Sequence, residues 1–255
     1  MPLDFKKEYK DLYMPKAKPV FIEVPPMTFF AVAGTGDPNE PDGAYARALE
    51  LLYGLSYTVK MSKMGAWQPE GYFDYVVPPL EGLWWAGAGA FDGASIVDKG
   101  ALSWVSLICQ PDFVTPEVFA WACAELAKKK PALAEACERA SEGYAEGVPY
   151  LVHFAEGPCV QVMHRGSYDD EPASVEKLSA YMHSEGLPCD IAEGGESPVG
   201  HRAQGGFDGS AVLAALDSNG AVPNVRLHHE IYLADPRRTK PENLKTVIRH
   251  PVRRA

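Results

Sequence analysis

Short runs of β-branched and aromatic residues, each ended by proline or glycine, set the main limit on how this chain can fold. Such runs are typical of β-strands, and they predict strands at 20–24, 29–33, 72–77, 102–108, 150–154, 159–164, 228–233 and 246–248. Apolar residues at helical spacing predict helices at 42–64, 115–130, 131–142 and from 170 onward. Each half of the chain therefore reads strand, helix, strand, strand, which indicates an α+β fold with antiparallel strands.

The repeated order predicts two tandem β-α-β-β modules, at 20–145 and 150–252, within a single domain that spans 1–255. We expect a pseudo-twofold axis to relate the modules, with antiparallel sheets that carry helices on one face and a central ligand cleft between the uncovered faces. The stretch 192–224 is rich in small residues and proline, so we expect a long surface loop with a short helical pattern at 211–216. Asp42 and Thr115 are the expected N-caps of the first two helices.

Charge and composition exclude several classes of function. The net charge of −10 argues against nucleic-acid binding, because a phosphate backbone needs a basic surface. Basic residues do gather near the C-terminus, and we expect them to be solvated: Arg237, Arg238, Lys240, Lys245, Arg249, Arg253 and Arg254. No run of 18 apolar residues and no apolar N-terminal segment occur, so we expect a cytoplasmic protein without a membrane span. The five cysteines are odd in number and lack a Cys-x-x-Cys motif, which predicts reduced thiols and no structural zinc.

Glu230 is the first candidate for a functional residue. Side chains alternate along a strand, so Glu230 shares one face of the predicted strand 228–233 with His228 and Tyr232. If the intervening Ile231 packs against the helices, the carboxylate of Glu230 faces the cleft. An unpaired carboxylate there would have a raised pKa, and it would attract a lipophilic cation or act as a general base. The alternative is an ordinary glutamate that forms a salt bridge at the surface.

The pair His228 and His229 resembles half of a metal site. Adjacent strand residues point to opposite faces, so these two side chains cannot bind the same ion. We therefore expect no metal and no cofactor. The glycine-rich segments 87–93 and 205–209 are expected to be flexible loops, because a dinucleotide fingerprint must open a helix and the first segment leads into a strand.

Aromatic residues are concentrated in the first half of the chain. The set comprises Tyr72, Phe73, Tyr75, Trp84, Trp85 and Trp104. Aromatic rings stack on flat ligands and attract cations, but they also pack in ordinary cores. Because strand faces alternate, some of these rings belong to the core, and the sequence leaves open which ones line the cleft.

Several longer segments resemble one known family, the stand-alone GyrI-like proteins, which are named for a gyrase inhibitor. The matching segments are 4–13, 36–39, 52–57, 79–85, 161–172, 228–238 and 244–252, and together they extend over almost the whole chain. The resemblance implies two tandem β-α-β-β modules around a ligand cleft. In related drug-sensing domains a buried glutamate receives cationic aromatic compounds, and residue matching makes Glu230 that glutamate.

Some stand-alone relatives hydrolyse cyclopropanoid antibiotics with a pocket glutamate and a tyrosine. By this resemblance we expect Glu230 and Tyr75 to be catalytic: water attacks the strained ring, a phenolate leaves, and a tyrosine hydroxyl stabilises the developing charge. The expected ligand-binding residues are Tyr72, Trp84, Trp85, Trp104, Gln161, Met163, Tyr168, His228 and Tyr232. The expected ligand is a hydrophobic aromatic or cationic small molecule. One alternative is a non-catalytic module that sequesters or senses drugs. Contact with gyrase rests on the family name alone and is not expected.

Overall fold

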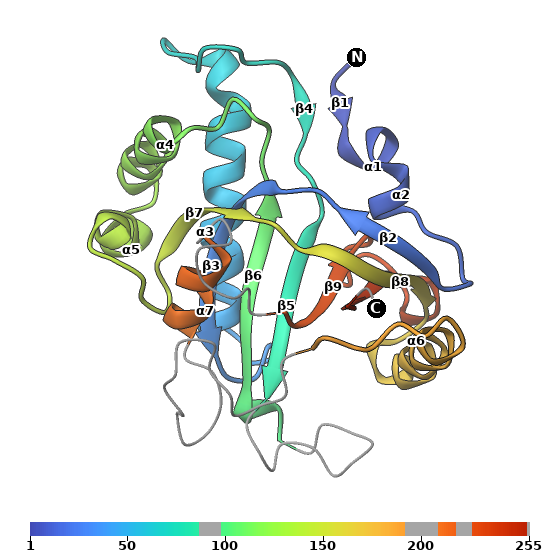
Figure 1. Ribbon diagram of the computed structural model, residues 1–255. Helices are drawn as coiled ribbons and strands as arrows, with labels where there is room; N and C mark the ends of the chain where they lie inside the picture. Colours follow the sequence, from blue (N-terminus) through green and yellow to red (C-terminus); the bar gives the residue numbers. More distant parts are fainter. Residues whose placement is uncertain (87–97, 192–208, 218–225, 254–255) are drawn as a thin grey trace.

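The computed structural model describes residues 1–86, 98–191, 209–217 and 226–253 (Figure 1). Its centre is an eight-stranded sheet in which every pair of neighbours is antiparallel. In sheet order the strands are β2 (Val20–Val24), β8 (Gly157–Arg165), β10 (Lys245–Pro251), β9 (His228–Tyr232), β5 (Leu80–Ala86), β6 (Leu102–Cys109), β3 (Met27–Thr35) and β7 (Pro149–Phe154). The strands of both halves thus form one continuous sheet, which confirms the α+β class.

Each half of the chain supplies a strand, a helix and two further strands. The first half gives β3, α3 (Ala44–Lys60), β5 and β6, and the second gives β8, α6 (Pro172–Ser184), β9 and β10. The halves join at the centre, where β5 pairs with β9 and Gly82 lies opposite Glu230. The edge strands cross over, because β2 pairs with β8 and β7 pairs with β3. Counted inward from either edge, the sheet therefore has the same order: a strand from the other half, then the first, third and second strands of one half. The pseudo-twofold axis and the module boundaries stay predictions.

The helices α3 and α6 cover the same face of the sheet. One row of paired residues crosses this face, namely Val32, Ser106, Gly82, Glu230, Ile248 and Val162. At one end of the row, Val162 and Ile248 pack in a cluster with Leu178 and Met182 of α6. At the other end, Tyr45 of α3 contacts Trp104, which lies on the same face of β6 as Ser106. Glu230 is thus on the helix-bearing face, between the two helices.

The opposite face is covered by α7 (Gly209–Leu216), which contacts β3, β6 and β7. A Cβ atom on Gly209 would lie 2.9 Å from Cβ of Ala33, so the helix approaches the strand closely. Val212, Leu213 and Leu216 are buried. The predicted surface excursion therefore contains a buried helix, because its apolar sequence needs a covered face. The predicted loop at 87–93 and residues 205–208 of the second glycine-rich segment lie outside the described residues.

The N-terminal arm packs on the domain as β1 (Leu3–Asp4), α1 (Phe5–Glu8) and α2 (Lys10–Tyr13). β1 pairs with β4 (Tyr75–Val76) in a separate parallel sheet. The strand predicted at 72–77 is therefore reduced to two residues. Its aromatic rings pack on Phe113 instead of extending the main sheet.

The remaining helices lie at the periphery. Thr115 caps α4 (Pro116–Lys129) as predicted, since its hydroxyl accepts a hydrogen bond from Val118 N at 3.4 Å. Gly43, and not Asp42, is the N-cap of α3. α5 (Ala134–Glu138) packs on α4. Within the described ranges, no helix combines the length and apolar character required to cross a membrane.

Candidate functional site

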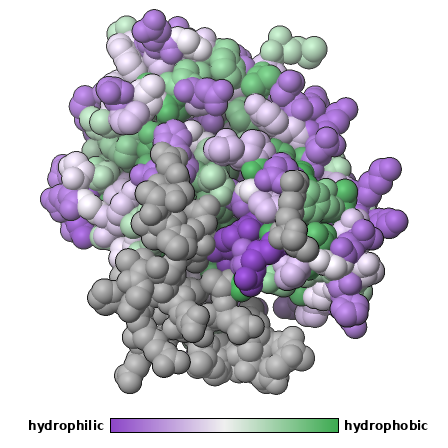
Figure 2. All heavy atoms as spheres, in the orientation of Figure 1, coloured by the Kyte–Doolittle hydropathy of each residue, from purple (hydrophilic) through white to green (hydrophobic). Residues whose placement is uncertain are grey.

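Alternation along β9 places His228, Glu230 and Tyr232 on the face that carries α3 and α6. The premise that Ile231 packs on these helices is wrong, because Ile231 lies on the opposite face. The polar residues are partly open to solvent: the side chain of Glu230 is 14% exposed and that of His228 is 24% exposed. These two side chains are therefore not sealed in the core. On the face of the molecule drawn in Figure 2, a strongly hydrophilic area lies beside the grey atoms.

A chain of hydrogen bonds orients the carboxylate of Glu230. The Tyr232 hydroxyl donates to Oε2 at 2.7 Å, and the indole N–H of Trp84 donates to that hydroxyl at 2.7 Å. Nε2 of His228 lies 2.8 Å from Oε1, and its Nδ1 lies 2.8 Å from Nε2 of His250. Both carboxylate oxygens thus have partners, which fixes the rotamer and favours the ionised form.

A second carboxyl group, that of Glu171, lies beside Glu230 at the start of α6. Glu171 is only 9% exposed, and its Oε1 has no hydrogen-bond partner. Burial, and then the negative charge of Glu230, raise the pKa of Glu171 to about 10. Burial also opposes ionisation of Glu230, but hydrogen bonds from His228 and Tyr232 hold its pKa below the ordinary value. The condition for a raised pKa at Glu230, a carboxylate without partners, is therefore not met, because His228 and Tyr232 both contact it.

The spacing of these groups is also relevant to metal binding. The ligand-type atoms of Glu171, His228 and Glu230 all lie within 4.8 Å of one another, close enough to surround one ion. However, Nε2 of His228 and both oxygens of Glu230 already form hydrogen bonds, which an ion would have to replace. His228 and His229 point to opposite faces of the sheet, as predicted, and do not share a position.

Aromatic rings line this site beside the carboxylates. Tyr45 at the start of α3 lies 5.5 Å from Trp84 and 5.1 Å from Trp104, between ring centroids. Tyr168, which is 38% exposed, meets Tyr232 edge to face at 5.9 Å. Gly82 permits this arrangement, because a Cβ atom there would lie 2.6 Å from Nε1 of Trp84.

The structure brings together four of the predicted ligand-binding residues around Glu230. These are Trp84, Tyr168, His228 and Tyr232. Trp104 is buried behind Tyr45 and contributes packing. Sequence reasoning missed Glu171, Tyr45 and His250, because each reaches the site from a different element. The one available signal for Glu171 was its place directly before Pro172, which opens a helix.

The remaining predicted residues lie elsewhere. Tyr75, expected to be catalytic, is fully buried near the far end of α3, where its hydroxyl lies 3.5 Å from Ser56 O. Tyr72 donates to Lys60 O at that same end. Tyr45, by contrast, occupies the end of α3 that contacts Trp84. Tyr75 and Tyr72 are therefore not part of the Glu230 site.

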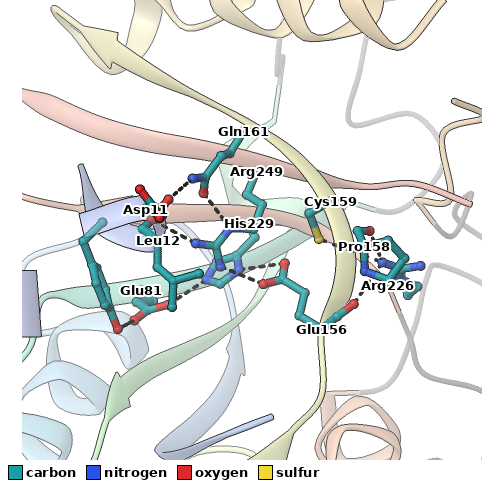
Figure 3. Close-up of polar contacts among 11 residues, drawn as sticks. Asp11, Leu12, Glu81, Glu156, Pro158, Cys159, Gln161, Arg226, His229 and Arg249 are labelled. Atoms are coloured by element: carbon teal, nitrogen blue, oxygen red, sulfur yellow. Dashed lines mark hydrogen bonds and ion pairs between the residues drawn. The ribbon is translucent and has the colours of Figure 1, made fainter. Parts of the chain in front are cut away.

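Three more predicted ligand-binding residues point to the opposite face because of strand alternation: Trp85, Gln161 and Met163. Gln161 belongs to a buried polar network there (Figure 3). In this network Arg249 pairs with Glu156 at 2.8 Å, and His229 lies 3.0 Å from Glu156 and 3.1 Å from Glu81.

The buried network connects the N-terminal arm to the sheet and shifts the pKa values of its members. The hydroxyl of Tyr13 donates to Glu81 at 3.0 Å, which ties the N-terminal arm to the sheet. Burial opposes ionisation of both Glu156 and His229. Their mutual attraction, together with Arg249, nevertheless lowers the pKa of Glu156 to about 2. Glu156 and Glu81 raise the pKa of His229 to about 9. The expectation that Arg249 is solvated is wrong, because alternation on β10 directs it inward and leaves it 2% exposed.

The cavity beside this network measures only about 10 Å³. That volume holds about one water molecule. The buried network is therefore suited to holding the fold together and offers no room for a ligand.

Comparison with known proteins gives clear structural relatives. No protein-family model matches the chain, and no curated protein sequence matches it. An uncharacterised conserved protein from Listeria innocua is 40% identical with a TM-score of 0.75, and the match covers 98% of this chain and all 100% of that protein. A hydrolase from Listeria innocua is 38% identical with a TM-score of 0.73, covering 98% and 100%. A hydrolase encoded by lin2189 of the same organism is also 38% identical, with a TM-score of 0.74 and coverage of 99% and 100%. At this identity over the full length, the chain belongs to the same protein family as these Listeria innocua proteins.

Proposed function

We propose that the Glu230 site binds an aromatic small molecule that carries a positive charge. The observation that supports this most is the partly exposed carboxyl group of Glu230, which lies next to the rings of Trp84 and Tyr168 and whose pKa is held low by its hydrogen bonds. In the described part of the chain, no lysine or arginine forms an ion pair with Glu230 or Glu171. A cationic ligand would supply the missing positive charge, and its flat body would stack on the rings.

We also propose that the chain is GyrI-like. The matching segments of the sequence support this assignment, as does the strand, helix, strand, strand order of each half. The location of Glu230 between α3 and α6 agrees with the role that the resemblance implies for it.

Hydrolysis at the same site is a second candidate function. Two relatives at 38% identity are described as hydrolases. Glu230 would take a proton from water as the water oxygen attacks a carbon of a strained cyclopropane. The ring C–C bond breaks, its electrons pass into the conjugated dienone, and the resulting phenolate accepts a hydrogen bond from a tyrosine hydroxyl. Tyr232 takes the place of Tyr75 in this scheme: its hydroxyl donates to Glu230 at 2.7 Å before the reaction, and it would turn to the phenolate once Glu230 holds the proton taken from water.

A fluorescence titration with rhodamine 6G, a cationic aromatic dye, tests the binding proposal. We expect Glu230→Gln to weaken dye binding by about tenfold or more, since a charge-assisted contact is worth roughly 1.5–3 kcal/mol. A neutral dye of similar size should lose much less. Glu176→Gln, an exposed change on α6, is the matched control and should bind like the wild type. Equal weakening of cationic and neutral dyes would contradict a charge role.

Hydrolysis is tested separately by mass spectrometry of a cyclopropanoid compound incubated with the pure protein. Catalysis predicts many equivalents of a hydrated, ring-opened product, and Glu230→Gln should abolish it. Recovery of the intact compound would leave a binding function only.

A further inference from the structure

Two carboxyl groups from different elements meet at the proposed binding site. Glu171 stands at the start of α6 and Glu230 in the middle of β9, and their oxygens lie within 4.8 Å of each other. Such proximity between two acids is unfavourable unless something positive lies between them. Some other group, or a proton, must therefore offset the repulsion between the two carboxylates.

Glu171 and Glu230 differ in the hydrogen bonds that their carboxyl groups form. Glu230 is contacted by His228 and Tyr232, one at each oxygen. Glu171 is more deeply buried, and its Oε1 finds no hydrogen-bond partner. This asymmetry favours the charge on Glu230 and a neutral acid at Glu171, because a buried charge without partners is the costlier arrangement.

The other groups that face the pair do not supply a full positive charge. They are Asp169 and Thr246 near Glu171, Tyr45 and Tyr168 near Glu230, Asp235 near Tyr168, and His250 behind His228. Burial, together with His228, lowers the pKa of His250 to about 3, so this ring is neutral. Among the described residues, His228 is the one basic side chain with a recorded contact to either acid, and it contacts Glu230.

We propose that Glu171 and Glu230 hold one proton between them, so that the two acids together carry a single negative charge and the site accepts singly charged aromatic cations. A like-charged pair that shares one proton is the arrangement known from other paired carboxyl sites. The inference rests on the proposed binding function for its ligand class, but the shared proton itself exists without any ligand.

This arrangement predicts how many protons are released when a cation binds. A monocation neutralises the charge on Glu230 and can leave the proton on Glu171. A dication needs a second carboxylate, so Glu171–COOH must become Glu171–COO⁻ and release H⁺ to the solvent. Binding of a dication is therefore expected to release close to one proton, and its affinity should rise with pH.

Ethidium and propidium make a matched pair of probes, because they share one aromatic body and carry one and two positive charges. Titration calorimetry in two buffers of different ionisation enthalpy counts the protons released on binding. We expect the wild type at pH 7 to release close to one proton with propidium and far less with ethidium. Glu171→Gln should release none with either dye and should keep its affinity for ethidium within about threefold. Equal proton release from the wild type and Glu171→Gln would overturn the inference.

Infrared spectroscopy of the ligand-free protein tests the shared proton without any dye. We expect a C=O band of a protonated carboxylic acid at pH 7 that is absent from Glu171→Gln. Should that variant fail to fold, Glu230→Gln provides a second test, since loss of the neighbouring charge should let the band disappear at a lower pH. Absence of the band from the wild type, or a stoichiometric metal ion that EDTA removes, would overturn the shared proton. If the band is present but neither dye binds, the proposed function fails and the shared proton stands.

Discussion

The two faces of β9 carry polar groups of opposite character. On one face, His229 pairs with Glu81 and Glu156, Glu156 also pairs with Arg249, and all of these side chains are buried. On the other face, Glu230 is partly exposed and lies against a second acid. One strand of five residues thus supports a closed, charge-balanced network and an open site in which, among the described residues, no lysine or arginine pairs with either acid. Matched charges indicate a structural role, and accessible acids without a lysine or arginine partner indicate a place for a ligand.

The largest expected effect concerns the buried network. Arg249→Met removes the buried guanidinium that pairs with Glu156 and leaves that carboxylate with one cationic partner fewer, so we expect a loss of about 3–5 kcal/mol in the free energy of unfolding. Arg237→Met is the control, because Arg237 is exposed and pairs with Asp235 at the surface. That change should cost at most about 1 kcal/mol. Urea unfolding curves give both values, and similar losses for the two variants would contradict the distinction.

The pH dependence of stability gives the next effect. The pKa of Glu156 is lowered to about 2 in the folded protein, so its contribution is present above the ordinary glutamate pKa and is lost as the pH falls toward 2. We expect a loss of up to about 3 kcal/mol between pH 4.5 and 2 from this group. Glu156→Gln should show a flatter profile in urea unfolding measured across that range. An unchanged profile would mean that Glu156 is not held ionised by the network.

A change at Gly82 affects the open face. Gly82→Ala places a methyl group 2.6 Å from Nε1 of Trp84 and 3.3 Å from the hydroxyl of Tyr232, so both side chains must move. We expect about 1–3 kcal/mol of destabilisation and at least a tenfold loss of rhodamine 6G affinity. The control is Ser179→Ala at an exposed position of α6, which should change neither the stability nor the dye affinity. Gly143→Ala would be a poor control, because Gly143 has a positive φ. Dye binding that survives Gly82→Ala would place the ligand elsewhere.

Two tyrosines provide the smallest and most specific comparison. Tyr232→Phe removes the donor to Glu230 and the acceptor for Trp84, so we expect about 1 kcal/mol of destabilisation. Hydrolysis, where it occurs, should fall by at least tenfold. Tyr75→Phe removes a hydroxyl that lies 3.5 Å from its nearest partner, and turnover should stay within about twofold of the wild type. A larger effect of Tyr75→Phe than of Tyr232→Phe would restore the original sequence-based choice.

Local patterns of the sequence were sufficient for most elements but not for their contacts. Period-two and helical spacing predicted nearly every strand of the sheet, the cap at Thr115 and the common face of His228, Glu230 and Tyr232. The strand at 72–77 was largely wrong, because burial of its rings on Phe113 outweighed their β-propensity.

The site was harder to predict because its parts are far apart in the sequence. Alternation fixes which residues share a face, but it does not say which face carries the helices. Gln161 and Met163 were consequently assigned to the wrong side, and the approach of Glu171 to Glu230 across the sheet had no local signal. Arg249 was misjudged for the same reason, because its partner Glu156 precedes another strand.

A crystal structure of the complex with rhodamine 6G would test the central claim most directly. The account predicts the charged end of the dye against the carboxylate of Glu230, with its ring system on Trp84 and Tyr168. A dye bound outside the space between α3 and α6, or one whose charged end faces away from Glu230, would contradict it.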